Sequence, residues 1–598
     1  MIGPRIDGYA PLRDYAAIGD GRTVGLVARD GSIDWLPLPD LDSESVFAAI
    51  LDSDRGGRFT LAPTIPFTIS RRYLPDTNVL ETTFCTDQGT VAVTDALTLP
   101  GQGLEPVREL QRRIDGRAGR VPLQWRLEPR FGYGGRLPRL ARRQGVAIAS
   151  SGNEALALCS FGAGEPVIAE GSIGADFEAA EGSSVLLALC FADQEPLVFP
   201  ARAELEARFQ STCASWRSWA GARDYDGPWR EAVIRSALAL KLLVYAPSGA
   251  IAAAATTSLP EALGGACNWD YRFSWIRDSA FTIEAFLRLG CRDEAQAYFW
   301  WLMHATQLTQ PRLQVLYRLD GGTRVDEREI PLDGYRRSRP VRVGNGAAGQ
   351  LQLDTYGELL QAAWLYARGG NRIDRDLGRR FAGLADFVCR IWRQPDAGIW
   401  EVRSDQAQFT QSKMMCAVAL DRALQLAQQE AIPSRHTARW RAEARAIRDF
   451  VETNCWSDKR NSYVRSAGEE TLDASLLLGI LHGYADPRSE RMLATVAAIR
   501  RELAAGPFVR RHGDDDGVPG GEGAFIACSF WLAEALARGG RVDAAAELME
   551  QLLALANDVG LYSEEIDPQT GEFLGNMPQG LSHLALISAA AAIDEATR

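Results

Sequence analysis

The sequence predicts a protein of two domains: an antiparallel β-sandwich over residues 1–225, with a linking helix at its end, and an (α/α)6 barrel over residues 226–598. Three observations predict this fold class. The chain has 598 residues, 46% of them hydrophobic, which is long for a single core and apolar enough to fold throughout. Strand signals dominate its first part, and helical periodicity dominates the remainder.

The strand signals extend from about residue 20 to residue 200. Short runs rich in β-branched and aromatic residues alternate there with Gly, Asp and Pro, as in RTVGLVARDGSIDWL, PFTISRRYL and VPLQWRLEPRF. This spacing of strands and turns is typical of an antiparallel sandwich. Residues 201–224 change to helical spacing with charges on one side, and strand signals largely end after DGPWRE. We therefore place the domain boundary near residue 225.

Twelve helical patterns follow the boundary. They cover residues 229–246, 272–289, 292–307, 354–368, 374–393, 411–428, 434–454, 471–482, 487–503, 523–538, 541–556 and 580–596. Asp486 before Pro487 predicts an N-cap, and Gly290, Gly539 and Gly560 stand where C-caps belong. Residues 229–246 are apolar almost all round and 434–454 carry many charges, which predicts an inner and an outer layer. In such a toroid, the loops at one end of the barrel axis can enclose a pocket for a small polar ligand.

Composition and charge exclude several classes of function. The 77 acidic and 65 basic residues give a net charge of -12 without long runs of one sign, so nucleic acid is not an expected partner. The sequence shows neither a signal peptide nor a stretch of about 18 apolar residues, so we expect a cytoplasmic protein without membrane contact. Isolated cysteines and scattered histidines predict reduced thiols, no metal and no cofactor. The chemistry should depend on carboxylates, and self-association is left open.

The segment Asn268–Asp278 (NWDYRFSWIRD) is the densest candidate for a binding site. It combines aromatic side chains with two sets of Arg and Asp at the entrance of a predicted helix; the candidates are Trp269, Asp270, Tyr271, Trp275, Arg277 and Asp278. A pyranose ring stacks its apolar face on Trp or Tyr, and its hydroxyl groups require paired donors and acceptors. The alternative is a structural Arg–Asp ion pair that fixes two helices.

Three further segments carry candidate carboxylates. Glu358 follows Asn345 and Tyr356 near a helix start between apolar neighbours, where burial would keep its proton for general acid catalysis; a helix N-terminal charge is the alternative. Glu564, beside Glu565, lies before the last helix, where a carboxylate would activate water. Arg511 begins a stretch through Asp514–Asp516 to Glu522, for which a turn is preferred to a calcium site because the EF-hand spacing is absent.

Several motifs resemble glycoside hydrolase family 15. These are NWDYRFSWIRDS, VGNGAAGQLQLDTYGE, GGEGAFIACSFWLAEAL and EEIDPQTGEFLGNMPQGLSH, and the opening VGLVARDGSIDWLPLPDLDSESVFAAILD resembles the N-terminal domain of the family's bacterial trehalase-like and glucoamylase-like members. The resemblance implies a β-sandwich before an (α/α)6 barrel. It also implies exo-acting hydrolysis of small α-linked glucosides with inversion, by two carboxyl groups roughly 6.5–9.5 Å apart.

The resemblance assigns roles to individual residues. Glu358 matches the acid motif, Glu564 the base motif with Glu522 as the second choice, and Arg277 with Asp278 the pair that holds the terminal glucose. The other candidates for the sugar pocket are Trp269, Asp270, Tyr271, Trp275, Asn345, Tyr356, Arg511, Glu522 and Glu565. Two positions depart from the family pattern: Gly357 precedes Glu358 where two adjacent glutamates are typical, and Ala417 stands where tryptophan is common.

Four hypotheses for the function follow. The first is a trehalase, because the N-terminal half resembles the trehalase-like branch, and the second is an enzyme for malto- or isomalto-oligosaccharides. A glycoside phosphorylase on the same barrel is disfavoured, because the candidate base Glu564 is present. A catalytically inactive carbohydrate-binding protein is disfavoured because both glutamates are present. Glu358→Gln is expected to abolish turnover if Glu358 is the acid.

Overall fold

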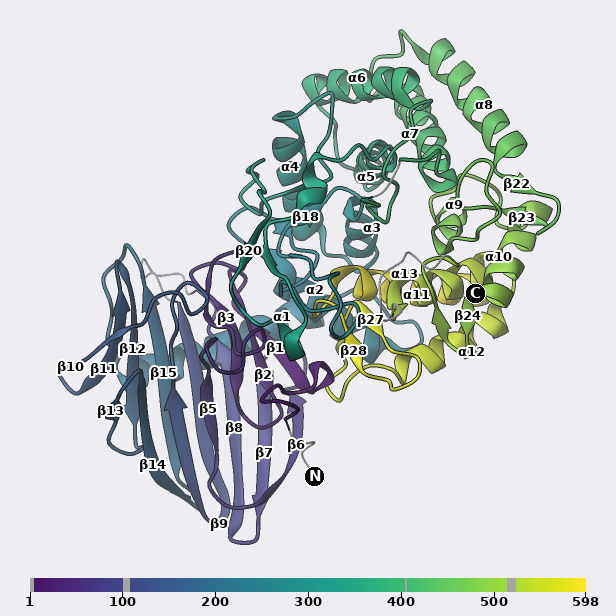
Figure 1. The fold of residues 1–598 in the computed structure, drawn as a ribbon. Coiled ribbons are helices and arrows are strands. Elements are labelled where there is room, and N and C mark those ends of the chain that lie inside the picture. The colour runs from purple at the N-terminus through teal and green to yellow at the C-terminus, as the bar shows by residue number, and fades with distance from the viewer. Residues whose placement is uncertain (1–4, 101–107, 404–405, 514–522) are drawn as a thin grey trace.

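The computed structural model describes residues 5–100, 108–403, 406–513 and 523–598. Its N-terminal part is built of strands β1 (Tyr15–Gly19), β2 (Val24–Ala28), β3 (Ile33–Pro37), β4 (Ser45–Phe47), β5 (Phe59–Pro63), β6 (Phe67–Tyr73), β7 (Leu80–Thr86), β8 (Gly89–Leu97), β9 (Glu109–Leu127), β10 (Arg139–Arg143), β11 (Val146–Ser151), β12 (Glu154–Phe161), β13 (Val167–Ala169), β14 (Ser172–Ala180) and β15 (Ser184–Ala192). These strands form the lower left part of Figure 1.

The strands form two antiparallel sheets that share the long strand β9. The first half of β9 pairs with β8 and β15, and its second half pairs with β5 and β14. Strand β1 of one sheet packs over β8 of the other, and β5 packs over β7, so the sheets face each other. Arg112 is buried between them, where it binds Asp95 and donates to the carbonyl of Phe59. The predicted antiparallel sandwich is confirmed.

The remainder of the chain is largely helical. Helix α1 (Arg202–Gly221) leads to α2 (Arg230–Leu243), α3 (Ser279–Arg288), α4 (Arg292–Gln307), α5 (Asp354–Arg368), α6 (Arg375–Ile391), α7 (Thr410–Gln428), α8 (Thr437–Asn454), α9 (Leu478–Leu481), α10 (Glu490–Glu502), α11 (Ile526–Arg538), α12 (Val542–Leu553) and α13 (Gly580–Thr597). Each predicted helical pattern after residue 225 overlaps one of these helices. We retain the division near residue 225, between α1 and α2, as a proposal.

The helices form two concentric layers. Helices α3, α5, α7, α9, α11 and α13 each pack against the next, and α13 packs against α3, so the inner ring closes. Figure 1 shows α4, α6, α8, α10 and α12 around this ring. Helix α8 buries a narrow stripe that includes Trp440 and Ile447, as predicted for an outer helix. This arrangement confirms the (α/α)6 barrel.

Some predicted details were wrong. Helix α2 was expected in the inner layer because it is apolar over most of its surface, but it lies outside the ring against α13, and β1 and α1 also pack against it. Helix α3 begins seven residues later than predicted, at Ser279, because Ser274–Trp275 form strand β18 with β19 (Leu316–Tyr317). Helix α10 has Ser489 rather than Asp486 at its N-cap position.

The predicted C-cap glycines have different outcomes. Gly290 follows α3 in a left-handed conformation, with φ of 71°, as a C-cap glycine should. Gly539 occupies the C-cap of α11, but the left-handed residue is the next one, Gly540, with φ of 83°. Gly560 lies in a turn beyond the end of α12, where its N–H donates to the carbonyl of Asn557.

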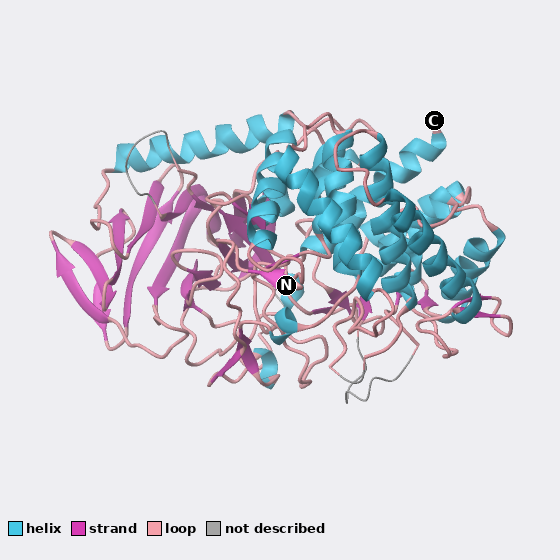
Figure 2. Ribbon diagram, turned by 90° about the horizontal axis from the view of Figure 1, so that it is seen from above, coloured by secondary structure: helices cyan, strands magenta, loops and turns pink. Residues whose placement is uncertain are grey.

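Loops and short strands gather at one end of the helices (Figure 2). They include β16 (Val244–Tyr245), β17 (Ala250–Ile251), β20 (Arg328–Ile330), β21 (Val341–Val343), β22 (Trp456–Ser457), β23 (Ser462–Tyr463), β24 (Ala504–Ala505), β25 (Phe508–Val509), β26 (Ala524–Phe525), β27 (Glu565–Ile566) and β28 (Phe573–Leu574). The sandwich supports these loops from outside: Trp35 donates to the carbonyl of Ala255, and Arg272 donates to that of Ser43.

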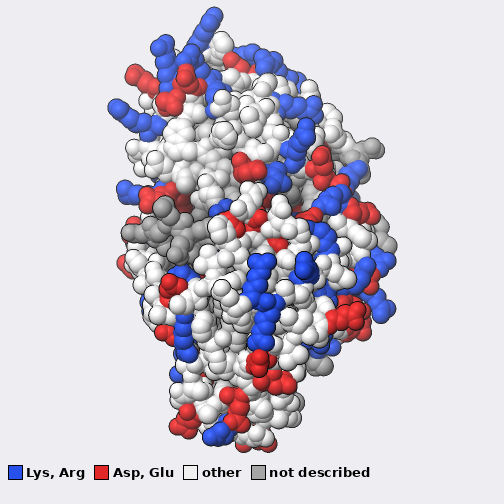
Figure 3. All heavy atoms as spheres, turned by 90° about the vertical axis from the view of Figure 1, so that its left-hand side faces the viewer, with Lys and Arg blue, Asp and Glu red and all other residues white. Residues whose placement is uncertain are grey.

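The surface carries charges of both signs. On the face shown in Figure 3, basic and acidic side chains are interspersed. Within the described ranges, no helix combines the length and apolar composition that crossing a bilayer requires.

Candidate active site

A cavity of about 430 Å³ opens among the loops at this end of the barrel. Its volume lies within the range of roughly 300–1,000 Å³ that is usual for small-ligand sites. In the described part of the chain, the segment before each helix of the inner ring contributes to its wall. The lining residues are Glu261, Ala266, Cys267, Trp269, Tyr271, Arg277, Arg342, Ile399, Trp400, Glu401, Val402, Arg403, Arg465, Arg511, His512, Phe525, Glu564 and Gln579.

The segment Trp269–Phe273 is extended, which separates its side chains by function. The carbonyls of Trp269, Tyr271 and Phe273 accept hydrogen bonds from the backbone of residues 253–258. Because successive side chains of an extended chain point to opposite sides, Trp269 and Tyr271 line the cavity. Asp270 and Arg272 form a fully buried ion pair of 2.7 Å instead. Alternate residues of this segment therefore either line the cavity or form a buried ion pair, and sugar binding by Trp269 and Tyr271 stays a prediction.

Arg277 connects this segment to the loop before α7. Its guanidinium donates to Asp278 at 2.9 Å and to the carbonyl of Ile399 at 3.1 Å, and it lies 3.5 Å from Oε1 of Glu401. Trp275 is buried and donates its indole N–H to the same oxygen of Glu401 at 2.6 Å. Arg277 lines the cavity. Trp275 and Asp278 do not line it, but Trp275 binds Glu401 and Asp278 binds Arg277, and both of those partners do.

Glu401 lies in a tight turn at the wall of the cavity. Its φ of 59° is left-handed, and so is that of Gly398, at 65°. A non-glycine residue in this conformation costs on the order of 1–3 kcal/mol, and such residues cluster at functional sites. Burial raises the pKa of Glu401, while Arg277 and the indole of Trp275 oppose that rise. With 20% of its side chain exposed, Glu401 is a carboxyl group that can hold a proton and meet a ligand.

Glu564 lines the same cavity from the segment before α13. It is 1% exposed, and the N–H of Asn576 donates to Oε2 at 3.4 Å. Burial, with the charge of Glu261, raises the pKa of Glu564 to about 8, against a hydrogen bond from Tyr271 and the charge of Arg511. Burial and the carboxylates of Glu564, Glu261 and Glu401 also raise the pKa of Tyr271. Tyr271 thus shares one electrostatic environment with both carboxyl groups.

Three further arginine residues line the cavity: Arg511 binds carboxylates, and Arg342 and Arg403 stack on Trp269. Arg511 binds Glu261 at 2.7 Å and lies 3.4 Å from Glu565, so it compensates carboxylates that lie near Glu564. Trp269 has the guanidinium carbons of Arg342 and Arg403 at 4.4 and 3.9 Å from its ring centroid. These cation–π contacts hold the indole of Trp269 in place at the cavity wall.

Comparison with known proteins identifies the family. The family model described as "Glycosyl hydrolases family 15" matches residues 227–591. This chain belongs to glycosyl hydrolase family 15. A second model, "Trehalase-like, N-terminal", matches residues 7–212. The chain is therefore a glycoside hydrolase, as the sequence motifs predicted.

Relatives of this family 15 enzyme match along nearly its whole length. A trehalase of Mycobacterium tuberculosis is 38% identical over 97% of this chain and 89% of its own, and one of Thermoplasma volcanium is 35% identical over 99% and 95%. A crystal structure of a bacterial glucoamylase complexed with acarbose has a TM-score of 0.76 at 14% identity, covering 99% of this chain and 96% of that one. At that identity, the structural likeness shows the fold alone.

Glu358 of this family 15 enzyme does not line the cavity. It is 0% exposed on the inner helix α5, with Nε2 of His482 at 3.3 Å from its Oε1. Burial, with the nearby charge of Asp354, raises its pKa well above the usual range, as predicted. Burial lowers the pKa of His482 to about 4, so this histidine is neutral near pH 7. Glu358 is therefore not part of this cavity wall, and its assignment as the general acid stays a prediction from the sequence.

The other predicted site residues divide into two groups. Trp269, Tyr271, Arg277, Arg511 and Glu564 line the cavity. Asp270, Trp275, Asp278, Asn345, Tyr356 and Glu565 are buried behind the cavity wall or in the core. Asn345 caps a 3-10 turn by accepting from the N–H of Ala347, and the hydroxyl of Tyr356 accepts from the N–H of Leu313. Both therefore contribute to structure.

Three sequence-based predictions remain, on Ala417, on the segment Asp514–Glu522 and on a metal site. Ala417 is buried in the core of α7, away from the cavity. Glu522 and Asp514–Asp516 lie outside the described residues. Among the residues that the structure describes, no cluster of three His, Cys, Asp or Glu side chains has the arrangement of a metal site.

The sequence analysis missed Glu261, Arg342, Trp400, Glu401 and Arg403. A signal for the most important of them was present: Trp400-Glu401 stands between two predicted helices, 374–393 and 411–428. An aromatic residue followed by a carboxylate in an inter-helix loop is the same pattern that singled out residues 268–278.

Proposed function

We propose that this enzyme hydrolyses α,α-trehalose with inversion, with Glu401 as general acid and Glu564 as general base. The observation that supports these roles is that both carboxyl groups line one cavity, whereas Glu358 lies in the helical core. Support for trehalose comes from the relatives named trehalase, which match nearly the whole chain at 35–38% identity, and from the trehalase-like N-terminal model.

The reaction follows from what each group can do. Glu401 gives its proton to the glycosidic oxygen as the bond from that oxygen to the anomeric carbon breaks. Glu564 takes a proton from a water molecule, whose oxygen bonds to the same carbon from the opposite face, so one product is β-glucose. Arg277 lies near the carboxylate that Glu401 becomes, and the indole of Trp275 donates to it.

Glu261→Gln is expected to move the acid limb of the pH profile to lower pH. The charge of Glu261 helps to raise the pKa of Glu564 to about 8, and Glu261 also binds Arg511. Substitution of Glu261 removes a negative charge near Glu564, and it leaves the positive charge of Arg511 less compensated. Both changes lower the pKa of Glu564. Because the base acts ionised, activity should persist to lower pH. Profiles of kcat/KM for both proteins measure the shift; an unchanged or higher limb would contradict the role of Glu564.

The first test of the proposed function is glucose release from trehalose, maltose, isomaltose and soluble starch, with the product anomer followed by NMR at early times. Prompt β-glucose from trehalose, with little from the others, is the expected result. Prompt α-glucose as the sole initial anomer from trehalose would exclude inversion, because inversion releases one β- and one α-glucose. Turnover that requires phosphate would indicate a phosphorylase, and no turnover would favour a carbohydrate-binding protein.

We also infer that the enzyme acts in the cytoplasm. Cys159 and Cys416 support this location, because both are thiols rather than disulfide partners, as is usual for cysteines in a reducing compartment. Fractionation of the source cells tests the inference, and recovery of the activity outside the cytoplasm would contradict it.

A further inference from the structure

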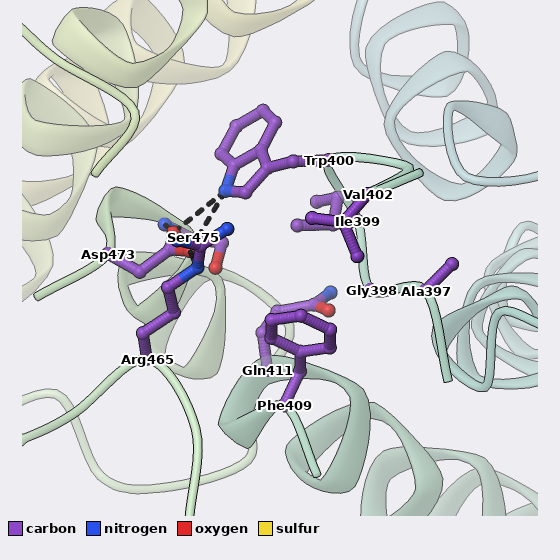
Figure 4. Close-up of a pocket in the computed structure, with 10 residues that line it drawn as sticks. All are labelled: Ala397, Gly398, Ile399, Trp400, Val402, Phe409, Gln411, Arg465, Asp473 and Ser475. Atoms are coloured by element: carbon purple, nitrogen blue, oxygen red, sulfur yellow. Dashed lines mark hydrogen bonds and ion pairs between the residues drawn. The ribbon is translucent and has the colours of Figure 1, made fainter. Parts of the chain in front are cut away.

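We propose that Asp473 is a positioning residue that holds Trp400 and thereby fixes the neighbouring Glu401 for proton transfer. This inference depends on the proposed role of Glu401 as general acid. It concerns a second, much smaller cavity, of about 10 Å³, behind the turn that carries Trp400 (Figure 4). Trp400 lines both cavities, as do Ile399, Val402 and Arg465, so its indole belongs to the wall that the two cavities share.

Asp473 holds the indole through both of its carboxylate oxygens. The N–H of Trp400 lies 2.9 Å from Oδ1 and 3.0 Å from Oδ2. Figure 4 shows this contact, with Trp400 on one side of the small cavity and Asp473 beside Ser475 and Arg465. Asp473 is 2% exposed, so its charge acts with little screening by solvent.

The carboxylate of Asp473 is itself fixed. The N–H of Ser475 donates to Oδ1 at 2.8 Å, and Nε of Arg465 lies 3.6 Å from Oδ2. The backbone of Asp473 forms a bridge with His512, and the next N–H, of Ala474, donates to the carbonyl of Arg511. Asp473 therefore stands where the segments before α7, α9 and α11 meet, and each of these segments contributes to the wall of the substrate cavity.

The turn that carries Glu401 depends on supports at both sides. On the substrate side, Arg277 donates to the carbonyl of Ile399. On the other side, Asp473 holds Trp400. Gly398 and Glu401 are left-handed at the two ends of the turn, so the backbone between them relaxes easily if one support is lost. Because a shift of about 1 Å in a catalytic group costs up to roughly 100-fold in rate, Asp473 should affect kcat more than binding.

The experiment compares Asp473→Ala and Asp473→Asn with Asp386→Ala. Asp386 is a matched control, because it accepts the indole N–H of Trp440 at 2.8 Å between the outer helices α6 and α8. We expect Asp473→Ala to lower kcat on trehalose at least tenfold with a change in KM below about threefold. Asp473→Asn should recover part of the loss, since its amide oxygen still accepts the N–H, and Asp386→Ala should keep kcat. If Asp473→Ala does not fold, Trp400→Phe decides, because it removes the same hydrogen bond, and wild-type kcat in that variant would overturn the proposal.

A double-mutant cycle tests whether the effect passes through Trp400. Trp400→Phe removes the indole N–H and keeps an aromatic wall. If Asp473 acts by holding that N–H, the double variant should be little slower than Trp400→Phe alone. The proposal would be overturned if the loss of kcat in the double variant equalled the product of the two single losses. It would also be overturned if Asp473→Ala changed KM and left kcat unchanged. Its failure is distinct from that of the proposed function, which is tested by substitution of Glu401 itself.

Discussion

Glu401→Gln is expected to lower kcat on α,α-trehalose by about 10²–10⁴-fold, the usual contribution of a general acid. The amide keeps the size of the side chain and its contact with Trp275 but has no proton to give. α-Glucosyl fluoride gives a sharper result, because fluoride leaves without full protonation: the variant should hydrolyse it with less than a tenfold loss. Steady-state kinetics on both substrates make the measurement. A loss of equal size on both would mean that Glu401 does not act as the acid.

Glu358→Gln is the matched control for this substitution. Glu358 is buried on α5 away from the cavity, so the variant should keep kcat within about fivefold. Its effect should appear in stability. Burial raises the pKa of Glu358 in the folded state, so the contribution of Glu358 to the free energy of unfolding falls as rising pH ionises this residue in the unfolded chain. Gln does not titrate, and the advantage in Tm of the variant should be larger at pH 8 than at pH 5. Loss of turnover in Glu358→Gln would restore the sequence-based assignment.

The fold was largely predictable because its patterns are local. Strand alternation and helical periodicity depend on which face of each element is buried, and both follow the chain. The failures came where tertiary contacts decide. Helix α2 is apolar over most of its surface because it packs against α13 and also against α1 and β1, which its own sequence does not distinguish from burial inside the ring. Ser274–Trp275 continue a helical pattern, yet they pair with β19.

The site was predictable in part for the same reason. The aromatic and charged residues at 268–278 are dense enough to indicate a binding site, and alternation along an extended chain then selects Trp269 and Tyr271 for the cavity. Sequence could indicate that Glu358 is buried with a raised pKa, and the structure agrees. It could not show which way a buried carboxyl group faces. Glu401 needs a turn with left-handed φ and contacts from Trp275 and Arg277, none of which a linear pattern displays.

Glu564→Ala is expected to lower kcat by about 10²–10⁴-fold on trehalose and on α-glucosyl fluoride alike, because water still lacks a base whatever the leaving group. This separates it from Glu401→Gln, which should spare the fluoride. Azide, an anion that needs no base, should restore turnover of the fluoride and give a β-glucosyl azide. Glu522→Ala serves as the comparison, since Glu522 is the alternative base predicted from the sequence. If azide restores Glu522→Ala and leaves Glu564→Ala inactive, Glu522 is the base, and Glu564 only shapes the wall beside Tyr271.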